Sequence, residues 1–107
     1  MARIFEQVDV TVAANAETTA SIFTSTSEIP RVLKRVWSTH KTATNDLVVF
    51  DEREKIADVP CDALPVQTPF IDFNRKIKVG KMVRVGFREG AGAGHTAPII
   101  VESEIPD

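Results

Sequence analysis

The sequence predicts an all-β protein: a small antiparallel β-sandwich, jelly-roll-like, with seven or eight short strands in one domain over residues 1–107. The first observation is the segment 76–88, where Val83, Val85 and Phe87 alternate with polar or small residues. This period of two places the three side chains on one face of a strand, whereas a helix would scatter them. The second observation is that short apolar segments recur along the chain with turn signals between them, as in sandwiches and jelly rolls. The strand–helix alternation of a parallel sheet is absent.

The first two strands are expected at 4–12 and 18–25. Valines alternate with polar residues in the first segment, and the second is rich in threonine, which favours strands. Between them, Asn15 tolerates the unusual backbone angles of a tight turn. We therefore expect the two strands to pair as an antiparallel hairpin.

The segment 29–37 has two interpretations: a strand, or a short helix that covers one face of a sheet. Its apolar residues recur at helical spacing, and Ser27 is suited to cap a helix. Pro30 and the repeated β-branched residues argue against a helix. Because the rest of the chain has the pattern of strands, we favour a strand.

A second hairpin is expected in the middle of the chain. Residues 47–50 form a continuous apolar run, which is typical of a strand buried on both faces, and 55–59 is the return strand. The acidic residues around the tip are expected to be solvated. Prolines at 60 and 65 then end the strand, so residues 60–69 are the expected long connection between sheets.

The remaining strands are expected at 70–73, at 76–79 and 82–88 as a pair separated by Gly80, and at 99–105. The last strand has apolar residues in both alternation classes, so each of its faces can meet a partner. Between the last two strands lies the glycine loop 90–94, which is expected to be a hairpin loop whose glycines permit positive φ angles.

Composition and charge exclude several classes of protein. The formal net charge is -2, so no global basic field favours nucleic acid, and nucleic acid is an unlikely partner. No apolar run is long enough for a membrane span, and residues 1–14 show no secretory signal. We therefore expect the protein in a virion or in the cytoplasm. Cys61 is the only cysteine and is expected to be a small buried apolar residue.

Ten of the thirteen basic residues fall into two local clusters, and together they would form a basic patch if both lay on one face of a sheet. One cluster surrounds Trp37 and the other follows the segment 76–88. The residues concerned are Arg31, Lys34, Arg35, Lys41, Arg75, Lys76, Lys78, Lys81, Arg84 and Arg88. Lysines on strand edges also serve simply to prevent edge pairing, which is the favoured explanation.

No catalytic set, metal site or cofactor motif is recognisable. The glycine loop lacks the spacing of a dinucleotide fingerprint and the Lys-Ser or Lys-Thr of a P-loop. His40 and His95 lie in predicted loops and show no closely spaced metal-binding pair, so both are expected to be solvated. Trp37, the only tryptophan, is expected to fill the core. Three residues are nevertheless kept as weak candidates for ligand binding: Trp37, His95 and Gly92.

These observations favour a non-enzymatic structural or interaction module that assembles into homo-oligomers or with other structural subunits. The general layout is similar to that of capsid-associated jelly rolls, a likeness that covers the overall layout and no specific motif. It implies a virion component, such as a capsid, turret or decoration protein. The alternative is a carbohydrate- or ligand-binding β-sandwich module with Trp37 and the loop 90–95 at its site, and a glycan as partner.

Overall fold

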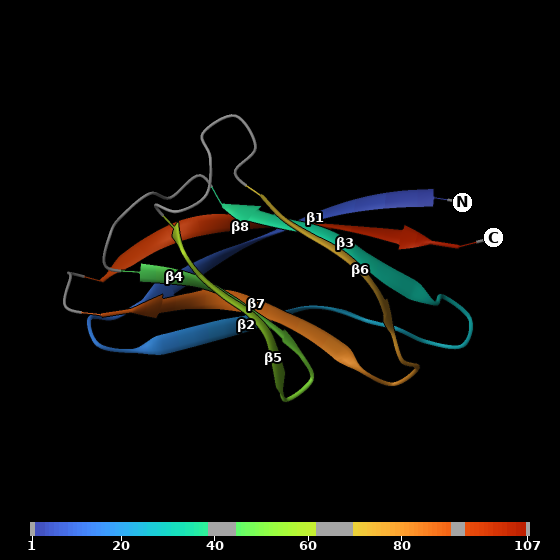
Figure 1. The fold of residues 1–107 in the computed structure, drawn as a ribbon, viewed down its shortest axis with the longest axis horizontal. Coiled ribbons are helices and arrows are strands. Elements are labelled where there is room, and N and C mark those ends of the chain that lie inside the picture. The colour runs from blue at the N-terminus through green and yellow to red at the C-terminus, as the bar shows by residue number, and fades with distance from the viewer. Residues whose placement is uncertain (1, 39–44, 62–69, 91–93, 107) are drawn as a thin grey trace.

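The computed structural model describes residues 2–38, 45–61, 70–90 and 94–106, and it arranges them as two packed four-stranded sheets (Figure 1). Sheet A has the order β1-β8-β3-β6 and sheet B the order β2-β7-β4-β5, with every pair antiparallel. The strands are β1 (Ala2–Val12), β2 (Glu17–Thr24), β3 (Arg31–Ser38), β4 (Asn45–Asp51), β5 (Glu54–Pro60), β6 (Phe70–Ile77), β7 (Met82–Glu89) and β8 (His95–Ile105). The described residues contain no helix long and apolar enough to cross a membrane.

The two sheet orders are those of a jelly roll, in which eight strands form two Greek keys. The predicted fold class is confirmed. The predicted hairpin of 4–12 with 18–25 is wrong, because β1 pairs with β8 and β2 pairs with β7. The turn at Asn15 has the expected positive φ of 57°, but it carries the chain from one sheet to the other. Its backbone N–H donates to the carbonyl of Gly90 at 3.0 Å.

The predicted strand pair around Gly80 is also a crossing between sheets. The segments expected at 70–73 and 76–79 belong largely to one strand, β6, which ends at Ile77 in sheet A, while β7 lies in sheet B. Between them the N–H of Lys81 donates to the carbonyl of Lys78 at 3.0 Å. Gly80 has a φ of 86° at the third position of this turn, as a type II turn requires.

Most of the segment 29–37 lies in strand β3, which begins at Arg31, so the helical interpretation is wrong. This strand lies in the middle of sheet A, where it pairs with β8 on one side and with β6 on the other. It contains a β-bulge, because the register skips Lys34 between Leu33 and Arg35. Because of the bulge, each β3 residue after Lys34 points to the opposite face of the sheet from the one that strict alternation predicts.

The β4–β5 hairpin is confirmed, with Asp51 opposite Glu54. Leu47, Val48 and Val49 are fully buried, as expected for a strand covered on both faces. The chain then crosses from β5 in sheet B to β6 in sheet A, as predicted for residues 60–69, although 62–69 lie outside the described residues.

The core fills the space between the sheets. The predicted face of β7, with Val83, Val85 and Phe87, is fully buried there, and Cys61 is buried as expected. Burying each such apolar side chain stabilises the fold by about 1.5 to 3 kcal/mol. Gly86, on the other face of β7, has a different role: a Cβ atom there would lie 1.9 Å from the carbonyl oxygen of Thr18. The glycine therefore lets the backbone of β2 approach β7.

Candidate functional site

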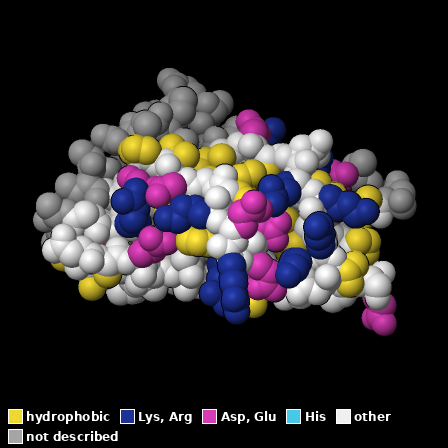
Figure 2. Space-filling view, turned by 60° about the horizontal axis from the view of Figure 1, so that its bottom comes forward, with side chains coloured by type: hydrophobic (Ala, Val, Ile, Leu, Met, Phe, Trp, Pro, Cys, Tyr) yellow, Lys and Arg dark blue, Asp and Glu magenta, His cyan; other side chains and the backbone are white. Residues whose placement is uncertain are grey.

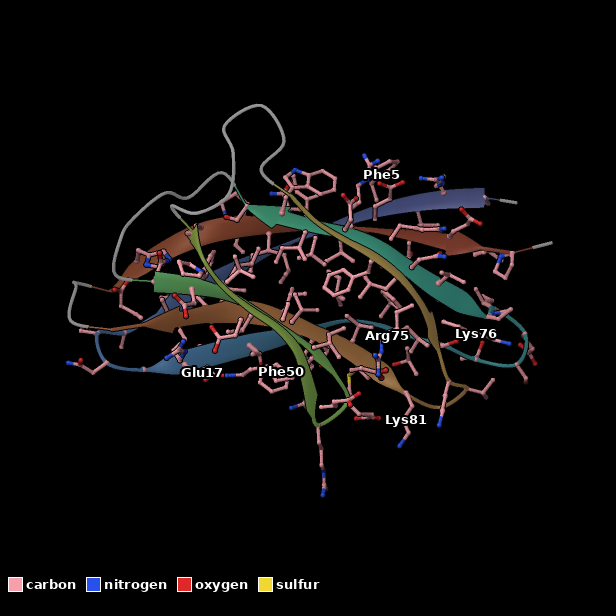
Figure 3. All side chains as sticks on the ribbon, viewed as in Figure 1. Phe5, Glu17, Phe50, Arg75, Lys76 and Lys81 are labelled. Carbon is pink, nitrogen blue, oxygen red and sulfur yellow. The ribbon has the colours of Figure 1, made fainter. Side chains whose placement is uncertain are left out.

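The outer face of sheet A carries an aromatic pair, of which Figure 3 labels Phe5. Phe5 on β1 is 62% exposed, and its ring meets the ring of half-buried Trp37 on β3 edge to face, with centroids 6.4 Å apart. The two strands flank β8, whose Ile100 is in register with Trp37 and with Gln7. We call the surface formed by Phe5, Trp37 and Ile100 the aromatic face.

The β-bulge in β3 explains the position of Trp37. Without it, Trp37 would share a face with Leu33 and fill the core, as the sequence predicted. With the extra residue, Leu33 and Val36 both point inward, fully buried, and Trp37 points outward. The prediction that Trp37 fills the core is therefore wrong.

Charged residues continue the aromatic face along β8. Glu102 and Glu104 belong to the outward alternation class, yet they are only 4% and 7% exposed. Arg3 pairs with both carboxylates, at 3.2 Å from Glu104, and Arg35 and Lys34 lie 3.9 Å from Glu102 and Glu104 respectively. Buried carboxylates are costly unless they are paired, so these basic residues offset the free-energy cost of burying Glu102 and Glu104.

The side chain of His95 is only 13% exposed and belongs to a strand, so the prediction of a solvated loop residue is wrong. It begins β8, and its ring faces the space between the sheets, where it meets Phe87 with centroids 4.8 Å apart. Its Nε2 is 3.0 Å from the amide of Asn45, and its Nδ1 is 3.2 Å from a carboxylate oxygen of Glu89. These contacts hold the imidazole in place from both sides.

The three predicted ligand-binding residues do not form one site. Trp37 lies on the outside of sheet A and His95 lies between the sheets, while Gly92 falls outside the described residues, as does His40. Among the described residues, no group of three histidine, cysteine or acidic side chains is close enough to hold a metal ion.

Arg31 forms a polar group between the sheets, separate from the one around His95. It is 8% exposed, and its guanidinium donates to the hydroxyl of Ser103 at 2.6 Å and pairs with Glu6. The same guanidinium lies 4.1 Å from the centroid of the Phe23 ring. Arg31 therefore ties β3 to β8 and β1 and does not contribute to a basic patch around Trp37.

Sheet B carries a charged network on its outer face. Lys55 on β5 reaches Glu17 on β2 at 3.4 Å and Asp58 at 3.3 Å, and Arg88 on β7 pairs with Asp58 and Asp46. Since β2 and β5 are the two edges of sheet B, the network spans the whole sheet. Figure 2 shows basic side chains on this side of the molecule set among acidic ones.

The pKa values of the two aspartates in this network move apart. Partial burial and the neighbouring Asp58 raise the pKa of Asp46 above its ordinary value, although Arg88 opposes the shift. Partial burial would also raise the pKa of Asp58, but hydrogen bonds from Asp46, Arg88 and Lys55 outweigh it and lower that pKa to about 2. Asp58 is thus the carboxylate that stays charged.

Two hollows lie on either side of the β4–β5 tip. The first, of about 560 Å³, is lined by the tip, by Arg75 and by the lysines of the β6–β7 turn, Lys78 and Lys81. The second, of about 370 Å³, is lined by Phe50, Arg84 and residues of β2. Glu52 and Arg53 at the tip line both hollows.

The basic residues do not gather on one face, so the two predicted clusters form no common patch. Within the described segments, seven basic side chains lie within 4.0 Å of a carboxylate. Five others in these segments have no such partner: Arg53, Lys76, Lys78, Lys81 and Arg84. Four of these five line the two hollows.

Sequence reasoning missed Phe5, which was not among the candidate binding residues. The signal was present: Phe5 shares its alternation class with Gln7 and Asp9, opposite the class of the buried Val10 and Val12.

The sequence matches no protein-family model, and no curated protein or solved structure is significantly similar to it.

Proposed function

We propose that the protein is a non-enzymatic structural module that assembles with copies of itself through the aromatic face. The observation that carries this proposal is Phe5, which is 62% exposed and packed edge to face on Trp37 in a sheet surface. Covering an aromatic side chain of this kind contributes about 1.5 to 3 kcal/mol. Aromatic residues are also the ones enriched at the centres of protein interfaces.

Charge supports a second copy of the chain as the partner. Around its apolar centre the face carries both signs, with Arg35 45% exposed beside Asp72, which is 70% exposed. A two-fold rotation brings the same patch of both subunits together, so basic residues of one copy can meet acidic residues of the other. Such a surface is complementary to itself.

We also propose that the assembly is part of a virion. Jelly rolls serve as capsid domains, and also as lectins and cupins, so the fold is compatible with a shell component. A carbohydrate-binding role at Trp37 is less favoured, because the Phe5 ring is packed against it.

Sedimentation analysis over a concentration series tests the assembly. We expect wild-type protein to form dimers or larger species and Phe5→Arg to shift the population to monomer. Val79→Arg is the matched control, because Val79 is also 62% exposed but lies in the β6–β7 turn, and it should leave assembly unchanged. A wild-type monomer at millimolar concentration, or equal effects of the two variants, contradicts the proposal.

A further inference from the structure

We propose that the two hollows at the β4–β5 tip form one binding site for an acidic oligosaccharide, a chain of sugars that carry carboxylates. The hollows measure about 560 and 370 Å³ and share Glu52 and Arg53, so one extended ligand can contact both. Volumes of about 300 to 1,000 Å³ are usual for ligand sites.

The positive charge of the site is available to a ligand. Arg53, Lys78, Lys81 and Arg84 come from three separate elements, and none of these four described side chains has a carboxylate within ion-pair distance. Figure 3 shows Lys81 pointing to solvent, whereas Arg75 turns toward the hairpin, where it pairs with Asp51 and Glu54. Arginines bind carboxylates through paired hydrogen bonds, which gives Arg53 and Arg84 the main role.

The rest of the lining carries groups that a sugar can use. Glu17 and Glu52 place carboxylates in the second hollow, where they can accept hydrogen bonds from hydroxyl groups. Phe50 adds an aromatic surface to this hollow for the apolar face of a sugar ring.

The walls of the site are held in place before a ligand arrives. The N–H of Glu52 donates to the carbonyl of Met82 at 2.8 Å, which fixes the hairpin tip against β7. Arg75 binds the base of the same hairpin through Asp51 at 2.9 Å. A site that is already formed loses little affinity to ordering.

This site is independent of the aromatic face. The hollows lie at the tip and outer face of sheet B, and the aromatic face lies on the outside of sheet A. Assembly through Phe5 therefore leaves Arg53 and Arg84 accessible, and the two proposals can fail separately.

Titration calorimetry with an oligogalacturonate at low salt tests the site. We expect wild-type protein to bind it with an affinity that falls as salt rises, and to ignore the neutral maltohexaose. The double variant Arg53→Ala/Arg84→Ala should weaken binding about tenfold or more, because it removes two charge-assisted contacts. Lys76→Ala is the matched control, since Lys76 also lacks a partner but lines neither hollow in the described structure.

Circular dichroism of each variant checks that a loss of binding is not a loss of folding. Three results would overturn the proposal: wild-type protein that does not bind the oligogalacturonate, a loss in Lys76→Ala equal to that in the double variant, or tighter binding of a single-stranded oligodeoxynucleotide. The second would indicate a general charge effect and the third a nucleic-acid site.

Discussion

Arg75 of sheet A binds Asp51 of sheet B, with its Nε donating to the aspartate oxygen at 2.9 Å. Asp51 is the inward residue at the end of β4, and its side chain is only 11% exposed. The ion pair thus links the two sheets beside the β4–β5 hairpin. The hydrogen bond that Arg75 donates to Asp51 raises the pKa of Arg75, in spite of partial burial.

Replacing Arg75 should destabilise the fold. Arg75→Ala leaves the Asp51 carboxylate largely buried without its cation, which costs about 1 to 3 kcal/mol. Urea unfolding followed by circular dichroism measures the change. Lys76→Ala, one position along the same strand and exposed, is the control and should stay within about 0.5 kcal/mol of wild type. Equal stability of the two variants would show that the link is unimportant.

Gly86→Ala should be among the most damaging small substitutions. The added Cβ would lie 1.9 Å from the carbonyl oxygen of Thr18, so β2 must move away from β7, at a cost of about 1 to 3 kcal/mol or more. Gly80→Ala meets no atom within 4 Å and suffers only from its φ of 86°, about 1 kcal/mol. Thermal melting should rank Gly86→Ala below Gly80→Ala, and the reverse order would refute the close approach.

Removing Arg31 should cost more than removing an exposed arginine. Arg31→Ala leaves the buried Ser103 without its donor and the half-buried Glu6 without its cation, a change of about 1 to 3 kcal/mol. Arg31→Lys keeps the charge but loses the paired geometry and the contact with Phe23, so its loss should be smaller. Denaturant midpoints for both variants check this ranking.

Asp58 should make stability depend on pH in the acid range. Its pKa is about 2 in the folded chain and about 3.9 when unfolded, so the unfolded state binds the proton first. The stabilisation is therefore complete above about pH 4 and is lost as the pH falls through about 2. Asp58→Asn should be less stable than wild type by up to about 1 kcal/mol at pH 7, and the gap should close only below about pH 2. Unfolding curves at several pH values measure the difference, and a gap that persists at low pH would exclude this origin.

The fold class and most strands could be predicted because their alternation is local. The valines of β1 and the apolar face of β7 identify buried strands without knowledge of their partners. Strand pairing could not be predicted in the same way. The short turns at Asn15 and Gly80 have the sequence of hairpin turns, yet both cross between sheets.

The two candidate surfaces could not be predicted, because they depend on a bulge and on tertiary packing that have no local sequence signal. A single extra residue in β3 moved Trp37 from the core to the surface, and no residue type marks that bulge. The hollows unite the hairpin tip with the β6–β7 turn, which lie about a quarter of the chain apart and meet only through tertiary packing. His95 was predicted to be solvated because the glycines before it obscure where β8 begins.

The pairing of Ala2 with Ile105 has a consequence for how this polypeptide reaches its native state. During translation β1 emerges long before β8, so sheet A cannot close until residues 95–105 have left the ribosome. Such distant pairing slows folding. A proteolytic nick that released β1 or β8 would remove an edge or a central strand of sheet A, and we expect the trimmed chain to unfold rather than persist as a smaller domain.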